Sequence, residues 1–210
     1  FKLFSFLRFS FQSRDPTERD VAARTLALVG KTLGVVGVIP FIRAACIDCV
    51  SWETKHTGLL IIRYLAKELG FGMLPHLYIF VGLSCDGLVS KEAIVRAAGA
   101  NAIASLALVS YPYGGDILIN SMEKLSEGIK IYRGGNKAAF IRATGCVLRL
   151  LERKQCQEYC KALLPLLRNN FRAKRQELKT CTLRCLQVCV EKCKPGDAFY
   201  GEDFFVFFFE

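Results

Sequence analysis

The chain has 210 residues, of which 52% are hydrophobic and 23% are charged. This composition is too apolar for an intrinsically disordered chain and is typical of a protein that buries a continuous core. Lysine and arginine number 29 against 19 acidic residues, and the net charge of +10 favours an anionic partner, of which nucleic acid is the usual one. A basic surface kept for solubility is the alternative explanation.

The first twelve residues carry five phenylalanines among polar residues. This run is too short and too interrupted to span a membrane, and it lacks the small-residue cleavage site of a signal peptide. We expect the last helix of a preceding repeat, or a divergent end. The next residues supply a helix start, with Asp15 as the N-cap and Pro16 in the first turn.

Two copies of one helical unit then follow each other. Each copy is an apolar helical stretch that stops at Leu-Gly, followed by a proline that opens a second apolar stretch. Gly34 and Gly70 are 36 residues apart, and Pro40 and Pro75 are 35 residues apart. Glycine after a helix and proline at the start of the next are the expected boundaries of helix pairs, and a period of this length indicates an α-solenoid.

The pattern continues along the chain, and we expect helices over residues 17–33, 39–49, 52–69, 73–85, 90–110, 116–132, 137–151, 155–171 and 174–191. The repeats would cover residues 15–50, 51–89, 90–133, 134–173 and 174–210, as a single solenoid segment of a longer protein. The last ten residues are aromatic rather than polar, although a solenoid end needs a polar cap, so we expect a piece of a longer solenoid or an end that is buried on a partner.

Small residues mark the first helices of successive repeats: Ala23, Gly58, Ala98 and Ala139. Their separations of 35, 40 and 41 residues exclude a strict 34-residue array and are typical of HEAT repeats, at roughly 40–47 residues. Small side chains there let neighbouring helices approach closely. The predicted fold is therefore an all-α HEAT-repeat α-solenoid, a right-handed superhelix segment of about five helix pairs.

The ten cysteines do not indicate a disulfide framework, because several lie inside apolar helical runs. With no secretory signal visible, we expect reduced thiols in the cytosol or nucleus. Cys46 and Cys49 form a C-x-x-C without a second ligand pair, so helix packing is the favoured interpretation. Four further cysteines recur at every fourth position: Cys181, Cys185, Cys189 and Cys193. The outer two lie roughly 18 Å apart along a helix, which predicts a packing stripe rather than one metal site.

Catalytic patterns are missing from the sequence. His56 and His76 lack the spacing of a metal-binding pair, and no phosphate loop, nucleophile elbow or paired catalytic carboxylates are found. We therefore expect a protein that is not an enzyme, with no metal, cofactor, small-molecule substrate or membrane contact.

Six motifs in order resemble one known family. They are Leu33-Gly34 with Ile39-Pro40-Phe41, Ser51-Trp52 with His56-Thr57-Gly58, Leu74-Pro75-His76-Leu77, Gly87-Leu88-Val89, Pro112-Tyr113-Gly114, and Arg133-Gly134 with Ala138-Ala139-Phe140. Their order and spacing resemble the HEAT-repeat domain of the largest subunit of splicing factor 3b, over about residues 15–196.

The resemblance implies a nuclear, non-catalytic scaffold of the U2 small nuclear ribonucleoprotein in pre-mRNA splicing. In that family the superhelix clamps the duplex of small nuclear RNA with the intron branch site, and the intron strand follows a basic path over several repeats. The implied partners are pre-mRNA intron, small nuclear RNA and other splicing factor 3b subunits. The alternative is a HEAT-repeat adaptor that binds protein, such as a nuclear transport receptor or a phosphatase scaffold.

The resemblance also indicates candidate RNA-binding positions near repeat boundaries. Arg19 and His56 match the family in residue type, whereas Leu60, Ile94 and Gly135 stand where the family typically has lysine. Nearby cations could restore the lost charge, since residues three apart share a helix face. The predicted nucleic-acid-binding set, which we expect along one ridge, is Arg19, His56, Arg63, Lys91, Arg96 and Lys137.

Overall fold

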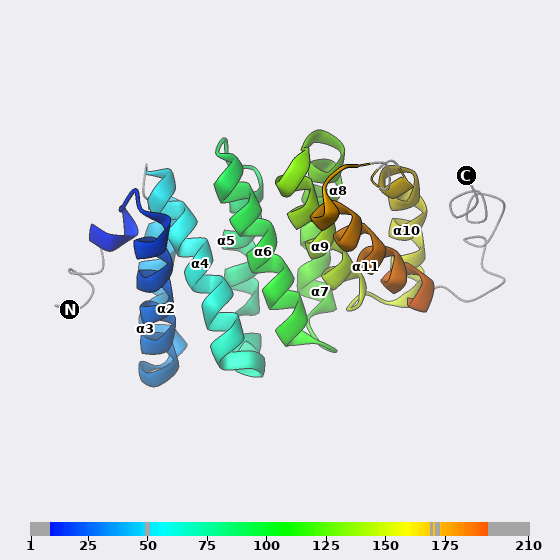
Figure 1. Ribbon diagram of the computed structural model, residues 1–210. Coiled ribbons are helices and arrows are strands. Elements are labelled where there is room, and N and C mark those ends of the chain that lie inside the picture. Colours follow the sequence, from blue (N-terminus) through cyan, green and yellow to red (C-terminus); the bar gives the residue numbers. More distant parts are fainter. Residues whose placement is uncertain (1–8, 49–50, 169, 171–172, 193–210) are drawn as a thin grey trace. The chain divides into compact units, whose positions relative to one another are not determined.

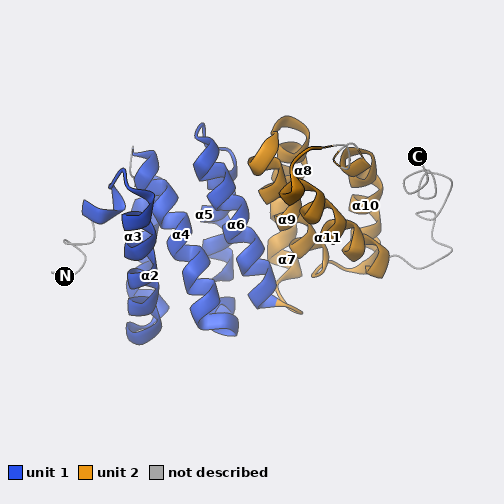
Figure 2. Ribbon diagram, in the orientation of Figure 1, with its two compact units in different colours: residues 1–110 blue, residues 111–210 orange. Residues whose placement is uncertain are grey.

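The computed structural model describes residues 9–48, 51–168, 170 and 173–192, and these contain helices and turns but no strand. The chain divides into two compact units, Phe1–Ser110 and Tyr111–Glu210 (Figure 2). The division falls between the two expected helices of the predicted third repeat. The single continuous segment, its repeat boundaries and its superhelical hand stay predictions, and both termini lie outside the described residues.

Unit 1 is built of two layers of helices (Figure 1). One layer contains α2 (Pro16–Leu33), α4 (Trp52–Leu69) and α6 (Ala93–Ser110), which pack successively against each other. The other contains α3 (Val35–Arg43), its π-helical continuation η1 (Ala44–Asp48), and α5 (Leu77–Leu88), preceded by the 3-10 segment η2 (Gly70–His76). The layers meet through contacts of α2 with α3, α4 with η1, and α5 with α6.

Local signals in the sequence explain where these helices begin and end. The Asp15 carboxylate accepts a hydrogen bond of 2.9 Å from the backbone N–H of Thr17, which caps α2. Gly34 and Gly70 follow α2 and α4 with φ of 93° and 53°, values that favour glycine. The boundaries of α2 and α4 therefore agree with the sequence prediction.

Three predicted elements are wrong in detail. The helix expected over 73–85 starts within the 3-10 segment η2, and its α-helical part, α5, covers Leu77–Leu88. The second helix was expected from Ile39, but α3 begins at Val35 and contains Pro40. Pro40 is exposed, so the carbonyl that loses its helical hydrogen bond lies beside solvent. The single helix expected over 116–132 is divided into α7 (Gly115–Leu118), the 3-10 turn η3 (Ile119–Ser121) and α8 (Met122–Ile131).

Small residues bring the two layers of unit 1 close together. An added Cβ at Gly58 would lie 2.6 Å from the Sγ of Cys46, and one at Gly99 would lie 2.9 Å from the carbonyl oxygen of Ser84. The four small positions singled out from the sequence are all buried: Ala23, Gly58, Ala98 and Ala139. Two stretches of this unit, Trp52–Leu88 and Ala93–Ser110, are long and apolar enough to cross a membrane, but core helices have the same composition.

Unit 2 repeats the two-layer arrangement. Its helices after α8 are α9 (Gly134–Leu148), α10 (Arg153–Arg168) and α11 (Gln176–Lys192). α9 packs on α11 and α8, while α10 packs on α11 and α8. Gly128 of α8 lies against the ring of Phe140, which is fully buried and meets Tyr132 edge to face with ring centroids 5.2 Å apart. The all-α prediction is thus confirmed for the described residues.

Candidate nucleic-acid interface

The first five residues of α2, α4 and α6 include three of the predicted RNA-binding residues. Arg19, His56 and Arg96 each lie within five residues of the start of their helix. Because α2 packs on α4 and α4 on α6, these three residues belong to one layer of unit 1. Arg63 is half-buried further along α4, and Lys91 is exposed in the loop before α6. Lys137 belongs to unit 2, so a ridge through all six residues stays a prediction.

Arg19 is buried rather than displayed to solvent. Its side chain is 1% exposed, and its Nη1 donates hydrogen bonds to the carbonyl oxygens of Ser13 at 2.7 Å and Arg14 at 3.0 Å. The guanidinium carbon also lies 5.2 Å from the centre of the Trp52 ring, within cation–π range. Contact of Arg19 with RNA stays a prediction, but in this structure its charge organises the loop before α2.

His56 is neutral at neutral pH. Its side chain is 9% exposed, and burial, reinforced by the positive charge of Arg19, lowers its pKa to about 4. Its Nδ1 is buried without a hydrogen-bond partner among the described residues. An electrostatic attraction of His56 for phosphate is therefore small, and contact of His56 with RNA stays a prediction.

Arg96 in α6 repeats the contact that Arg19 makes in α2, two helices further along the same layer. Its Nη1 donates to the carbonyl oxygens of Ser90 at 2.8 Å and Lys91 at 2.7 Å. In both helices the arginine reaches back to the residues five and six positions earlier. We call this contact the arginine clamp. It orders the loop that carries Lys91 and leaves the Lys91 ammonium in solvent.

Sequence reasoning missed a polar network between α2 and α4. The Tyr64 hydroxyl donates a short hydrogen bond to Asp20, which also pairs with Arg24 at 2.9 Å. The guanidinium of Arg24 and the ammonium of Lys67 lie 5.0 Å and 5.6 Å from the centre of the Tyr64 ring. Burial and the bond to Asp20 raise the pKa of Tyr64. Only the four-residue spacing of Asp20 and Arg24 could have signalled part of this network from the sequence.

A cleft of about 640 Å³ also escaped the sequence analysis. It lies in unit 1 at the starts of α4 and α6, bordered by η1 and the end of α5. Among the predicted site residues, Lys91 lines it. The complete lining is Cys46, Ile47, Ser51, Trp52, Lys55, Leu59, Leu83, Asp86, Gly87, Val89, Ser90, Lys91, Glu92 and Val95.

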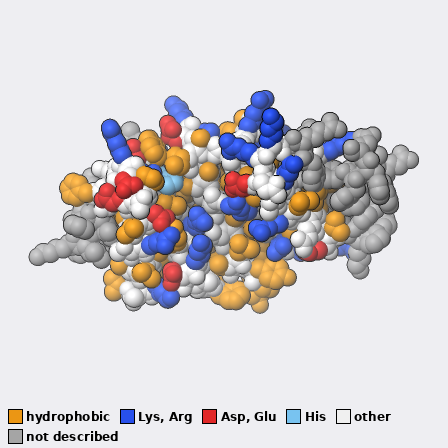
Figure 3. Space-filling model, in the orientation of Figure 1, with side chains coloured by type: hydrophobic (Ala, Val, Ile, Leu, Met, Phe, Trp, Pro, Cys, Tyr) orange, Lys and Arg blue, Asp and Glu red, His pale blue; other side chains and the backbone are white. Residues whose placement is uncertain are grey.

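Positive charge concentrates on unit 2. Its described residues include fifteen lysines and arginines against seven acids. Figure 3 shows blue side chains gathered over α8, α9 and α11. Lys137 is half-buried, and burial together with the charge of Arg133 lowers its pKa. The Arg175 guanidinium lies over the start of α9, with Nη1 3.3 Å and 3.7 Å from where a Cβ would stand at Gly134 and Gly135.

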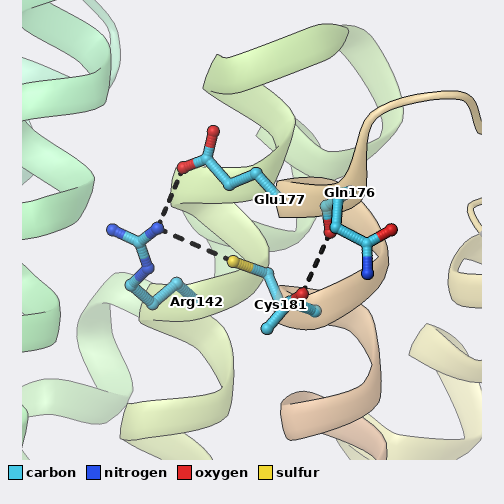
Figure 4. A network of polar contacts seen from close by, with 5 residues as sticks. Arg142, Gln176, Glu177 and Cys181 are labelled. Atoms are coloured by element: carbon cyan, nitrogen blue, oxygen red, sulfur yellow. Dashed lines mark hydrogen bonds and ion pairs between the residues drawn. The ribbon is translucent and has the colours of Figure 1, made fainter.

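The Arg142 side chain joins α9 to α11 (Figure 4). Its Nη2 lies 3.0 Å from the Glu177 carboxylate and donates to the Sγ of Cys181 at 3.7 Å. Arg142 therefore acts within the packing of unit 2, and Glu177 is held by it.

The cysteines of unit 2 support the packing interpretation. Cys181, Cys185 and Cys189 are buried in α11, which confirms this part of the stripe, while Cys49 and Cys193 lie outside the described residues. The thiols of Cys156 and Cys160 in α10 lie 3.8 Å apart, and this contact together with burial raises the pKa of Cys156. No group of three or more metal-ligating side chains occurs among the residues that the structure describes.

The stacked helix pairs define the chain as an α-solenoid of the HEAT type. An engineered protein of known crystal structure shares this fold, with a TM-score of 0.64 and 14% identity, over 90% of this chain and 79% of that protein. A designed armadillo repeat protein covers the same share of the chain and is matched over 100% of its own length at 14% identity, but its TM-score of 0.45 is too low to carry an argument. No family model matches the sequence.

Two yeast proteins are homologous to the chain. It is 33% identical over 191 residues to the U2 snRNP component HSH155 of Saccharomyces cerevisiae, a match that covers 90% of the chain. It is 31% identical over 175 residues to the U2 snRNP component prp10 of Schizosaccharomyces pombe, over 83% of the chain. The chain spans only 20% and 14% of the lengths of these relatives. These relatives confirm the resemblance to the largest subunit of splicing factor 3b.

Proposed function

We propose that the chain is a segment of a non-catalytic scaffold of the U2 small nuclear ribonucleoprotein and acts in the nucleus during pre-mRNA splicing. The single observation that carries this proposal is the 33% identity to a U2 snRNP component over 90% of the chain. A solenoid suits a scaffold because stacked repeats present long surfaces to extended partners.

The proposed RNA contacts involve the exposed cations rather than every predicted residue. Exposed Lys91 in unit 1 and the cations of unit 2 around half-buried Lys137 offer charge to backbone phosphates, and such contacts do not read the base sequence. Arg19 and Arg96 support the interface by clamping the loops beside it. The partners would be intron RNA, small nuclear RNA and the other subunits of splicing factor 3b.

Copurification tests this proposal. The tagged chain is incubated in nuclear extract, and the bound RNA and proteins are identified before and after ribonuclease treatment. We expect U2 small nuclear RNA and intron-containing transcripts, with splicing factor 3b subunits retained after the ribonuclease. Recovery of transport cargo or phosphatase subunits without splicing RNA would support the protein-binding adaptor instead.

A further inference from the structure

The cleft in unit 1 has the size and lining of a pocket for a flat organic group. Its volume of about 640 Å³ lies within the range of ligand pockets, about 300–1,000 Å³. Aliphatic side chains from every bordering element form much of its wall: Ile47, Leu59, Leu83, Val89 and Val95. Ser51 and Ser90 add hydroxyl groups to the lining. The Ser51 hydroxyl already donates to the Glu53 carboxylate and can still accept, whereas the Ser90 oxygen accepts from the backbone N–H of Glu92 and its hydroxyl can still donate.

The charges that line the cleft argue against an inorganic anion as its occupant. Lys55 and Lys91 are matched by Asp86 and Glu92, so the lining carries no excess of either sign. A phosphate group would gain little from such a site, whereas the carboxylates can accept hydrogen bonds from the amino group of a nucleobase. Exposed Lys91 remains available to a phosphate that stays outside the cleft.

Trp52 provides an aromatic surface that is already held in place. The Arg19 guanidinium lies 5.2 Å from the ring centre and is fixed by the carbonyls of Ser13 and Arg14. Trp52 lines the cleft and Arg19 does not. A base that stacks on a fixed ring loses less ordering entropy than one that must first order its partner.

We propose that this cleft binds one unstacked base of single-stranded RNA, which lies on the indole of Trp52 while Lys91 neutralises an adjacent backbone phosphate. The proposal rests on the proposed function for the class of its ligand. It adds a base-binding site beside a path that otherwise consists of phosphate contacts.

Intrinsic fluorescence tests the proposal directly because Trp52 is the sole tryptophan of the 210-residue chain. The chain is titrated with an eight-nucleotide oligoadenylate and with an abasic oligomer that carries the same number of phosphates. We expect saturable quenching by the oligoadenylate and little change with the abasic oligomer. Equal responses to both oligomers, or RNA binding by anisotropy without quenching, would overturn the proposal.

Two substitutions separate stacking from charge. Trp52→Leu keeps an apolar side chain but removes the stacking face, so affinity for labelled oligoadenylate should fall about 5- to 150-fold. Lys91→Gln should lower the slope of log K against log salt by about 0.7. The matched control is Lys67→Gln, which also removes one positive charge but lies about 22 Å along α4 from Trp52. This variant should leave the slope of log K against log salt unchanged.

The outcomes also distinguish this proposal from the proposed function. If nuclear-extract copurification recovers splicing RNA while Trp52 is not quenched, the base site is wrong and the scaffold role stands. If both experiments are negative, the RNA-binding function fails with the site. Quenching by RNA-free splicing factor 3b proteins alone would assign the cleft to a protein partner and overturn the proposal.

Discussion

Replacing Gly58 by leucine should destabilise unit 1 through overpacking. A Cβ at this position would lie 2.6 Å from the Sγ of Cys46 and 3.2 Å from the Cβ of Ala45, so even the first added atom overlaps η1. Leucine recovers about 0.8 kcal/mol of helix propensity over glycine. Overpacking of a well-packed contact costs about 1–3 kcal/mol, with larger values on occasion. Because the overlap at Gly58 begins with the first added atom, we expect a cost near the upper end of this range. We expect a net loss of about 2 kcal/mol in unfolding free energy.

Urea unfolding followed by circular dichroism at 222 nm measures this loss. The matched control is Gly82→Leu in α5, because an added Cβ at Gly82 meets nothing within 4 Å and its position is exposed. That control should be neutral or stabilised by less than about 1 kcal/mol. Equal unfolding midpoints for the two variants would refute the overpacking argument.

A double-mutant cycle identifies the atom responsible. Gly58→Ala should be better tolerated when Cys46→Ala removes the sulfur that lies 2.6 Å from the new methyl group. We expect a favourable coupling of at least about 0.5 kcal/mol. If the effects of the two substitutions on the free energy of unfolding simply add, the Cys46 thiol turns away without cost, and contact with Ala45 causes the destabilisation.

The remaining predictions concern pH, salt and thiols. The pKa of His56 is about 4 in the folded state, below its ordinary 6.5, so the unfolded chain binds the proton first as the pH falls. The free energy of unfolding should therefore drop by about 2 kcal/mol between pH 7 and pH 5. The variant His56→Gln should abolish this drop, and the control variant His76→Gln should keep it. Joint replacement of Lys91 and Lys137 by glutamine should lower the salt slope of single-stranded RNA binding by about 1.4; an unaltered slope would exclude these lysines as substitutes for the missing family lysines. Titration of the denatured chain should find ten free thiols, and recovery of several disulfides would contradict the reducing compartment.

The elements of unit 1 were predictable where their signals are local. Asp15, Pro16 and Gly34 cap or end α2 by contacts within a few residues, so the chain near them determines the boundary. The start of α3 was misplaced because Pro40 was taken as a first-turn residue. A proline is also tolerated within a helix where the carbonyl it leaves unbonded can reach water.

The candidate site was less predictable because burial depends on distant segments. Arg19 was predicted to contact RNA because it matches a position of the resembled family, yet its side chain is buried and Trp52, 33 positions later in the chain, lies beside its guanidinium. The cleft gathers residues from Cys46 to Val95, and no short motif marks them as neighbours. Periodicity identified the helices, but the side chains that meet at their ends depend on how the repeats pack.

The arginine clamp has a consequence for the evolution of the repeats. Six positions separate Ser13 from Arg19, and six separate Ser90 from Arg96, because each guanidinium must reach carbonyls at the start of its own loop. One residue inserted or deleted between the helix start and the arginine would rotate the arginine by about 100° around its helix, and one in the preceding loop would move the carbonyls that it reaches. Insertions and deletions among homologous chains should therefore accumulate outside these two seven-residue segments, even where the segments themselves diverge in sequence.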